Sequence, residues 1–245
     1  MLRSYLPAVL SASLIAALAS CTSGSTTGGA DASPPAESPA AFRAAGNEPS
    51  WRLDIGRAEM VLLTNFGQDR LVVATPKADA SGGTIRYVAR TEGGELVVTI
   101  TDRLCVDSMS GMPHPQTVEV VTGDRSLAGC GGEPVSLLQG AEWSVFEIDG
   151  APIVAGSRTT LAFAPGGQLA GQASCNSITG GYTLSGEGLA ISPGSGTRMT
   201  CDEAIMAQER TFLAALGMVQ GFSMSADGSL LLRTGDGRSI RARRP

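Results

Sequence analysis

The chain has 245 residues, which allows one large domain or two small ones at roughly 100 to 200 residues per domain. Its 42% hydrophobic and 17% charged residues and its 32 glycines are typical of a globular protein, and they exclude a coiled coil or a collagen-like repeat. The formal net charge of -5 disfavours nucleic acid as a partner. A single histidine, His114, leaves little material for histidine-based catalysis or for a histidine-rich metal site.

The N-terminus has the three parts of a secretory signal. Arg3 supplies the positive charge, an apolar stretch of 14 residues follows from Tyr5 to Leu18, and small residues precede Cys21. This stretch is shorter than the roughly 20 residues that a membrane-spanning helix needs. The segment Leu18-Ala19-Ser20-Cys21 resembles the lipobox of bacterial lipoproteins, in which the cysteine receives a diacylglycerol group. We therefore expect a signal peptide over residues 1–20 and lipidation of Cys21.

The residues after Cys21 extend this interpretation. Thr22 rather than aspartate follows the cysteine, which in Gram-negative lipoproteins implies sorting to the outer membrane. Residues 21–41 are rich in Gly, Ser, Thr and Pro and offer almost nothing to a core, so we expect a disordered tether. The alternative is an ordinary secreted protein in which Cys21 has no special role.

The rest of the chain predicts two domains of similar size, over residues 42–138 and 141–245. A tryptophan stands near the start of each, Trp51 and Trp143, and both are expected to be core residues. Runs of alternating hydrophobicity predict strands at residues 60–64, 70–74, 84–89, 95–101 and 117–121, and at 143–148, 159–164, 168–174, 181–184, 230–233 and 239–243.

Only one segment has helical spacing. Apolar residues recur at helical intervals over residues 202–216, and the preceding Thr200-Cys201-Asp202-Glu203 fits a capping box. The predicted fold class is therefore mainly β, with two small antiparallel β-barrel-like domains, the second of which carries one packed α-helix.

The cysteines other than Cys21 divide evenly between the two domains. Cys105 and Cys130 lie in the first domain, and Cys175 and Cys201 lie in the second. Four cysteines allow three pairings, and pairing within each domain is the one compatible with two separate cores. A metal site or a reactive thiol is the alternative, but the chain lacks the CxxC pairs of zinc ribbons, and an oxidising envelope disfavours free thiolates.

The sequence offers few candidates for catalysis, so we expect a protein that is not an enzyme and binds no cofactor or metal. No Gly-x-Ser-x-Gly nucleophile elbow occurs. His114 lies between two prolines, which indicates an exposed loop, and turn hydrogen bonds are the expected role of Asp102 and Asp107 beside Cys105. A solvated strand face, with anionic lipid or glycan as the alternative, is expected for Arg238, Arg241, Arg243 and Arg244.

Several motifs in the second domain occur in order along the chain. They are Gly171-Gln172-Ala173-Ser174-Cys175-Asn176, Gly180-Gly181-Tyr182, Thr197-Arg198-Met199-Thr200-Cys201 and the helical segment from Glu209 to Leu216. Together with Trp143 they resemble the META domain of the HslJ type, which is found in bacterial heat-inducible envelope proteins. The structural residues that this resemblance implies are Trp143, Asn176, Gly181, Tyr182, Arg198, Met199 and Glu209.

The resemblance carries further expectations. Arg198 and Glu209 are expected to pair across the packing face of the helix, and Asn176 is expected to hold a backbone conformation with positive φ. The family implies roles in envelope stress tolerance and, for HslJ relatives, in antibiotic resistance. The first domain resembles an uncharacterised envelope domain through Gly46-Asn47-Glu48-Pro49-Ser50-Trp51, Cys105-Val106-Asp107-Ser108-Met109-Ser110-Gly111 and Gly129-Cys130-Gly131-Gly132.

The expected protein is therefore a lipoprotein of the bacterial cell envelope that is anchored to the outer membrane and faces the periplasm. It would serve as a non-enzymatic stress-protection or binding module, with the membrane, through the lipid at Cys21, and an envelope protein or ligand as its partners. Two alternatives stay open. One is an inhibitor or chaperone-like partner of a periplasmic enzyme, and the other is a cryptic envelope hydrolase that uses Asp107 and His114.

Overall fold

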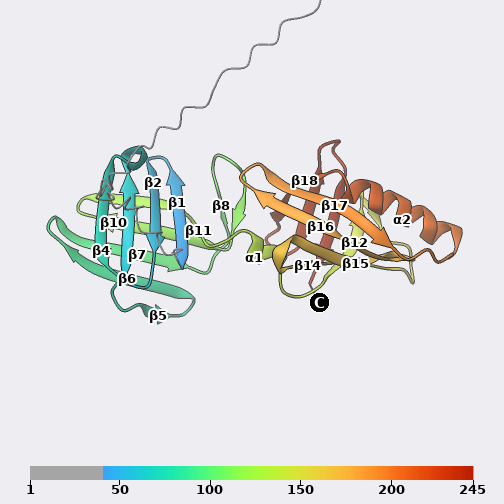
Figure 1. Ribbon diagram of the computed structural model, residues 1–245, viewed down its shortest axis with the longest axis horizontal. Coiled ribbons are helices and arrows are strands. Elements are labelled where there is room, and N and C mark those ends of the chain that lie inside the picture. Colours follow the sequence, from blue (N-terminus) through green and yellow to red (C-terminus); the bar gives the residue numbers. More distant parts are fainter. Residues whose placement is uncertain (1–40, 245) are drawn as a thin grey trace, which may run out of the picture. The chain divides into compact units, whose positions relative to one another are not determined.

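The computed structural model describes residues 41–244, which fold mainly as β-strands and confirm the predicted fold class (Figure 1). The predicted signal peptide, Cys21 and nearly all of the predicted tether lie outside the described residues. Over residues 41–244 the strands form two nine-stranded, barrel-like sheets and a two-stranded ribbon. Within the same residues, no helix is long and apolar enough to cross a membrane.

The first sheet is antiparallel and has the strand order β4-β3-β2-β1-β11-β10-β7-β6-β5. Its strands are β1 (Phe42–Asn47), β2 (Ser50–Ile55), β3 (Glu59–Thr64), β4 (Asp69–Ala74), β5 (Asp79–Ser81), β6 (Thr84–Thr91), β7 (Gly94–Thr101), β10 (Gln116–Thr122) and β11 (Arg125–Gly131). Side chains alternate between the two faces of a strand, and the inward set forms a core around Leu53, Met60, Leu96, Val98 and Val118.

A short ribbon connects β7 to β10. It consists of β8 (Cys105–Val106) and β9 (Pro113–His114), which pair with each other in antiparallel register. The single-turn η1 (Asn65–Gly67) joins β3 to β4 in the first sheet. In the second domain, η2 (Pro165–Gly167) lies at a predicted turn.

The second sheet is also antiparallel, with the order β17-β16-β15-β14-β12-β20-β19-β18 and the short β13 paired to β12. Its strands are β12 (Trp143–Ile148), β13 (Ala151–Pro152), β14 (Arg158–Ala164), β15 (Gln168–Ser174), β16 (Ser177–Ser185), β17 (Gly188–Gly196), β18 (Val219–Met224), β19 (Leu230–Thr234) and β20 (Ser239–Arg243). The short α1 (Val135–Leu138) contributes Leu138 to the same core, so this core begins a few residues before residue 141.

The two edges of the second sheet approach each other closely at Gly188. A methyl group at this glycine in β17 would overlap the carbonyl oxygen of Gln220 in β18. Gly188 also has a φ of 129°, which other residues rarely adopt. The curled sheet brings the edge strands β17 and β18 so close together at this point that only glycine fits at position 188.

The helix α2 (Glu203–Leu216) is the packed helix that the sequence predicted. It buries Phe212, Ala215 and Leu216 in the second core. The predicted capping box is wrong, because the helix begins after Asp202, whose side chain makes no capping hydrogen bond. Thr200 therefore lies too early in the chain to cap the first turn.

Candidate functional site

An open pocket lies on the first domain where two β-hairpin turns meet. It has a volume of about 480 Å3, which is within the range of roughly 300 to 1,000 Å3 that is typical of ligand sites. It is lined by residues of the β1–β2 turn, of the β3–β4 turn and of the start of β11, namely Asn47, Glu48, Pro49, Ser50, Asn65, Phe66, Asp69 and Arg125. The Gly46–Trp51 motif singled out in the sequence therefore supplies half of the lining.

The most unusual residue of the pocket is Phe66. Its backbone has a φ of 55°, and its neighbours Asn65 and Gly67 have values of 51° and 83°. Asparagine and glycine tolerate this left-handed conformation, whereas a bulky residue pays on the order of 1 kcal/mol for it. The side chain of Phe66 is 86% exposed, so packing in the core does not offset this cost.

Three charged side chains of the pocket are available for a ligand. Glu48, Asp69 and Arg125 are exposed and make no side-chain hydrogen bond or ion pair within residues 41–244. Two carboxylates and one guanidinium can together accept and donate hydrogen bonds in the same small space. Asn65 differs, because its side-chain amide donates to Oε1 of Gln68 at 3.1 Å and this bond braces the turn.

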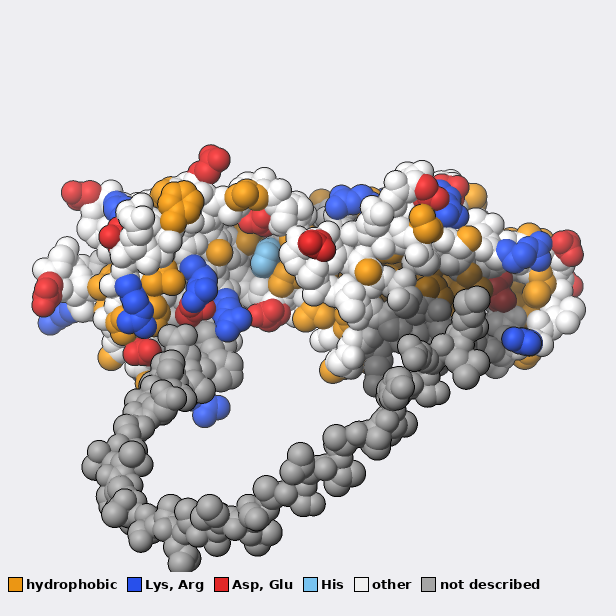
Figure 2. Space-filling model, turned by 45° about the horizontal axis from the view of Figure 1, so that its top comes forward, with side chains coloured by type: hydrophobic (Ala, Val, Ile, Leu, Met, Phe, Trp, Pro, Cys, Tyr) orange, Lys and Arg blue, Asp and Glu red, His pale blue; other side chains and the backbone are white. Residues whose placement is uncertain are grey.

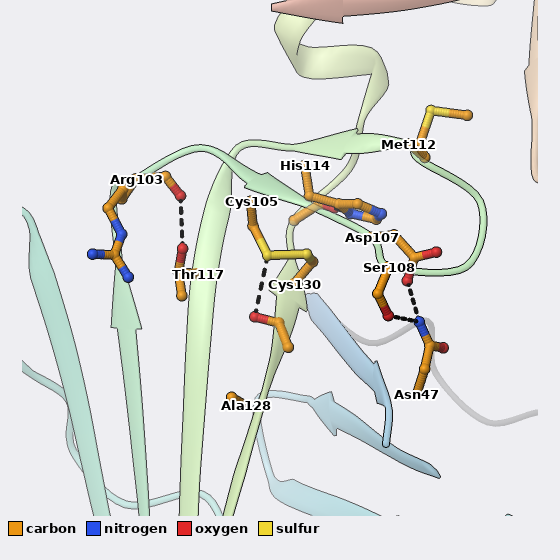
Figure 3. The surroundings of a disulfide bond; sticks show 12 residues. Asn47, Arg103, Cys105, Asp107, Ser108, Met112, His114, Thr117, Ala128 and Cys130 are labelled. Carbon is orange, nitrogen blue, oxygen red and sulfur yellow. Dashed lines mark hydrogen bonds between the residues drawn. A yellow bond between two sulfur atoms is a disulfide. The ribbon is translucent and has the colours of Figure 1, made fainter. Parts of the chain in front are cut away.

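Asn47, another polar residue of the lining, is held by the loop that follows β8 (Figure 3). Its Nδ2 donates to Oδ2 of Asp107 at 2.8 Å and to Oγ of Ser108 at 2.9 Å. These two bonds tie the β1–β2 turn, and with it one wall of the pocket, to a segment about 60 residues away in the chain. The predicted turn role of Asp107 is confirmed by its hydrogen bonds with Met109 and Ser110.

Asp107 is the centre of that loop. Its Oδ1 accepts hydrogen bonds from the backbone N–H of Met109 and Ser110 and from the Ser110 hydroxyl, at 3.2, 2.7 and 2.6 Å. Burial raises the pKa of Asp107, but the hydrogen bonds from Ser110, Asn47 and Met109 outweigh it and lower the pKa from 3.8 to about 2. A carboxylate with so low a pKa is a weak general base at neutral pH.

The disulfide and the histidine of the first domain lie beside this loop. Cys105 in β8 is bonded to Cys130 in β11, as the sequence predicted (Figure 3). The prediction that His114 lies in an exposed loop is wrong, because the residue is half-buried and pairs with Cys105 as part of the strand β9. Nδ1 of its ring lies 3.0 Å from the carbonyl oxygen of Gly132. The other flanking acid, Asp102, accepts a hydrogen bond from Nε2 of Gln116 at 2.8 Å.

In the second domain, polar residues of the predicted motifs form a closed network around the other predicted disulfide, Cys175–Cys201. Glu209 of α2 is only 7% exposed. Its Oε2 accepts from the backbone N–H of Cys175 and Asn176 at 3.0 and 2.8 Å, and its Oε1 accepts from Nδ2 of Asn176 at 2.8 Å. The helix is thereby fixed to the turn that follows β15.

Asn176 extends the network to the segment before α2. Its Oδ1 accepts from the backbone N–H of Met199 at 2.6 Å and from Oγ1 of Thr197 at 2.9 Å. The predicted pairing of Arg198 with Glu209 is wrong, because the Glu209 oxygens are taken by Cys175 and Asn176 and the Arg198 side chain is exposed. The predicted positive φ of Asn176 is wrong as well, since the turn places Ser174 at 104° instead.

The other predicted motif residues are Trp143, Gly181, Tyr182 and Met199. Trp143 is fully buried and donates from Nε1 to the carbonyl oxygen of Leu138 at 2.8 Å. Tyr182 is buried, donates to the carbonyl oxygen of Ala164 at 2.9 Å and contacts the Phe163 ring edge-on. Gly181 lies opposite Gln168 in the sheet, whereas the side chain of Met199 is 55% exposed.

No group of three or more His, Cys, Asp and Glu side chains placed to hold a metal ion occurs in residues 41–244. On the face that Figure 2 shows, acidic and basic side chains are interspersed and hydrophobic side chains lie between them. The pocket was not predicted from the sequence. A phenylalanine between Asn65 and Gly67, at a position where turns favour small residues, was the signal that could have revealed it.

Comparisons with known proteins assign one of the two domains. No curated protein matches the chain. A protein from Burkholderia xenovorans with an NMR structure is 23% identical, and the match covers 45% of this chain and 85% of that chain with a TM-score of 0.38.

The sequence model of the META domain matches residues 136–244. The two disulfides and this match fit an extracytoplasmic location. Residues 136–244 of this chain are thus a META domain.

Proposed function

We propose that the chain is a lipoprotein of the cell envelope, anchored to the outer membrane through Cys21, that acts as a non-enzymatic binding or protection module under envelope stress. The observation that carries this proposal is that each domain has its own disulfide, while Asp107 beside the first disulfide and Glu209 beside the second are used in structural hydrogen bonds. Disulfides of this kind persist in oxidising compartments.

The arrangement of Asp107 supports a non-enzymatic role. A hydrolase that used Asp107 and His114 would need a carboxylate or imidazole free to take up a proton. Asp107 instead accepts hydrogen bonds from three residues and has a pKa of about 2, so this carboxylate does not take up a proton near neutral pH. Activity profiling on envelope substrates with the Asp107→Ala, His114→Ala double variant tests this point, and a hydrolytic activity lost in that variant would contradict the proposal.

The anchor and location are tested on the native protein. Mass spectrometry of material extracted from the outer-membrane fraction should find a diacylglycerol group on Cys21 and both disulfides oxidised. A Cys21→Ser variant should leave the membrane fraction while its disulfides still form. An unacylated, reduced protein in the cytosol would overturn the location and the role together.

The protective role is tested in cells. A strain that lacks the gene should be more sensitive to heat and to drugs that act on the envelope, and the native gene should restore resistance. The Cys21→Ser gene should restore less, because the module is no longer held at the membrane. Unchanged sensitivity and envelope integrity in the deletion strain would refute a protective role.

A further inference from the structure

Folding alone does not account for Phe66. The side chain is 86% exposed and the backbone has a φ of 55°, so the residue neither fills the core nor fits the turn. Backbone strain that brings no packing in return is characteristic of residues kept for binding. The residue also lines the pocket, which puts an exposed aromatic ring within reach of a ligand.

The rest of the pocket lining narrows the kind of ligand. Phe66 and Pro49 provide apolar surface, and the unpaired Glu48, Asp69 and Arg125 provide hydrogen-bond acceptors and donors. The formal charges of these three groups are -1, -1 and +1. A ligand with a strong charge of either sign would therefore meet a like charge in a small space. An uncharged ligand with many hydrogen-bonding groups meets no such repulsion.

A pyranose ring has the two matching surfaces. One face of the sugar consists of C–H groups, which pack on the electron-rich face of an aromatic ring. Its rim consists of hydroxyls, each of which can donate to a carboxylate and accept from a guanidinium. We propose that the pocket formed by Phe66, Glu48, Asp69 and Arg125 binds the sugar ring of an uncharged carbohydrate.

The wall behind the ligand is held rigid by bonds already described. Asn47 lines the pocket and is fixed by Asp107 and Ser108, and the Asp107 loop is joined to β11 through the Cys105–Cys130 disulfide. A site that is ordered before binding loses less conformational freedom when the ligand arrives. The disulfide of the first domain therefore supports the carbohydrate site as well as the fold.

The inference rests on the proposed binding role but not on the lipid anchor, and its test separates the two. The mature protein, kept in a detergent without a sugar headgroup, is titrated calorimetrically with maltotriose and with tri-N-acetylchitotriose. We expect saturable binding of at least one trisaccharide. Failure of both to bind would overturn the carbohydrate assignment while leaving the location tests of Cys21 unaffected.

Variants then assign the site. Phe66→Asn should weaken binding at least tenfold and yet leave the unfolding midpoint unchanged or higher, because asparagine suits the left-handed turn. Asp69→Asn and Arg125→Gln should each weaken binding several-fold, and Val72→Ala, an exposed change on β4 outside the pocket lining, should not. Binding that survives Phe66→Asn, or an unfolding midpoint lowered by it, would contradict the role given to this ring.

A titration with a tripeptide tests the competing class of ligand, which is a zwitterionic peptide. Trialanine carries one positive and one negative end and could pair with the opposite charges of the pocket. We expect no binding under conditions that saturate the protein with the trisaccharide. Saturable binding of trialanine that Phe66→Asn abolishes, without binding of either sugar, would replace the carbohydrate by a zwitterionic peptide.

Discussion

Glu209 binds Asn176 at two places. One carboxylate oxygen of Glu209 accepts from the backbone N–H of Asn176 and the other accepts from the side-chain amide of Asn176, both at 2.8 Å. The contact joins α2 to the turn after β15 across 33 residues of sequence. Because all three donors around the carboxylate are buried, the contact is worth more than an exposed hydrogen bond.

Replacing Glu209 by glutamine should therefore destabilise the second domain. Whichever way the new amide turns, its NH2 group faces a buried N–H donor, and we expect a loss of about 2–3 kcal/mol in the free energy of unfolding. Urea denaturation of the oxidised protein measures it. Glu203→Gln in the first turn of α2 is the matched control, because its side chain is 92% exposed and should change stability by less than about 0.5 kcal/mol. Equal effects of the two variants would contradict the bridging role of Glu209.

A second prediction concerns Gly129 in β11. A methyl group there would overlap the carbonyl oxygen of Ala45 and would lie 2.7 Å from Cζ2 of the Trp51 ring. We expect Gly129→Ala to cost about 1–3 kcal/mol in unfolding free energy and to shift the fluorescence of Trp51. Gly93→Ala, where the nearest outside atom is 4.0 Å away, should leave both unchanged. A Gly129→Ala variant with unchanged unfolding free energy and unchanged Trp51 fluorescence would show that the strand can move away from the ring at little cost.

The pH dependence of stability should carry the signature of Asp107. Its folded pKa of about 2 lies below the ordinary 3.8, so its contribution is complete above pH 3.8 and is lost as the pH falls towards 2. Allowing for solvent around this half-buried group, we expect about 1 kcal/mol. Chemical denaturation at pH 6 and pH 2 should show that Asp107→Asn is less stable than the native protein mainly at pH 6. The exposed Asp124→Asn serves as the control, and a difference that is the same at both pH values would contradict the assignment.

The two disulfides should act on their own domains. Each closes a loop between cysteines 25 or 26 residues apart, which corresponds to about 3 kcal/mol in the chain-entropy account. Replacing Cys175 and Cys201 by serine should raise hydrogen exchange in β14, β15 and α2 and leave exchange in β2 and β3 unchanged. Replacing Cys105 and Cys130 should do the reverse. Uniform loss of protection in both domains after either change would show that the two cores unfold together.

Much of the strand pattern could be predicted because burial alternates along it. The bounds of β12, β15 and β20 agree with the predicted runs to the residue, since each of these strands has one buried face. The strand β17 was missed because Ser, Pro and Gly after Ile191 are typical of a loop. That segment is extended because it pairs with β16, and tertiary pairing overrides local preference.

The candidate site was harder to predict than the fold. Its lining comes from three segments, at residues 47–50, 65–69 and 125, and only the sheet register brings them together. The disulfides could be predicted because each pair lies within one domain. The bonds of Glu209 could not, because the choice between Arg198 and the backbone N–H groups after Ser174 depends on where the turn points its donors.

Gly188 has a consequence for self-association. Because β17 and β18 approach each other closely at this residue, each of these edge strands limits access to the other there. A larger residue would push the strands apart and expose their edges, to which strands of other copies could pair. The absence of a side chain at residue 188 therefore protects the protein against association of one copy with the next through these strands.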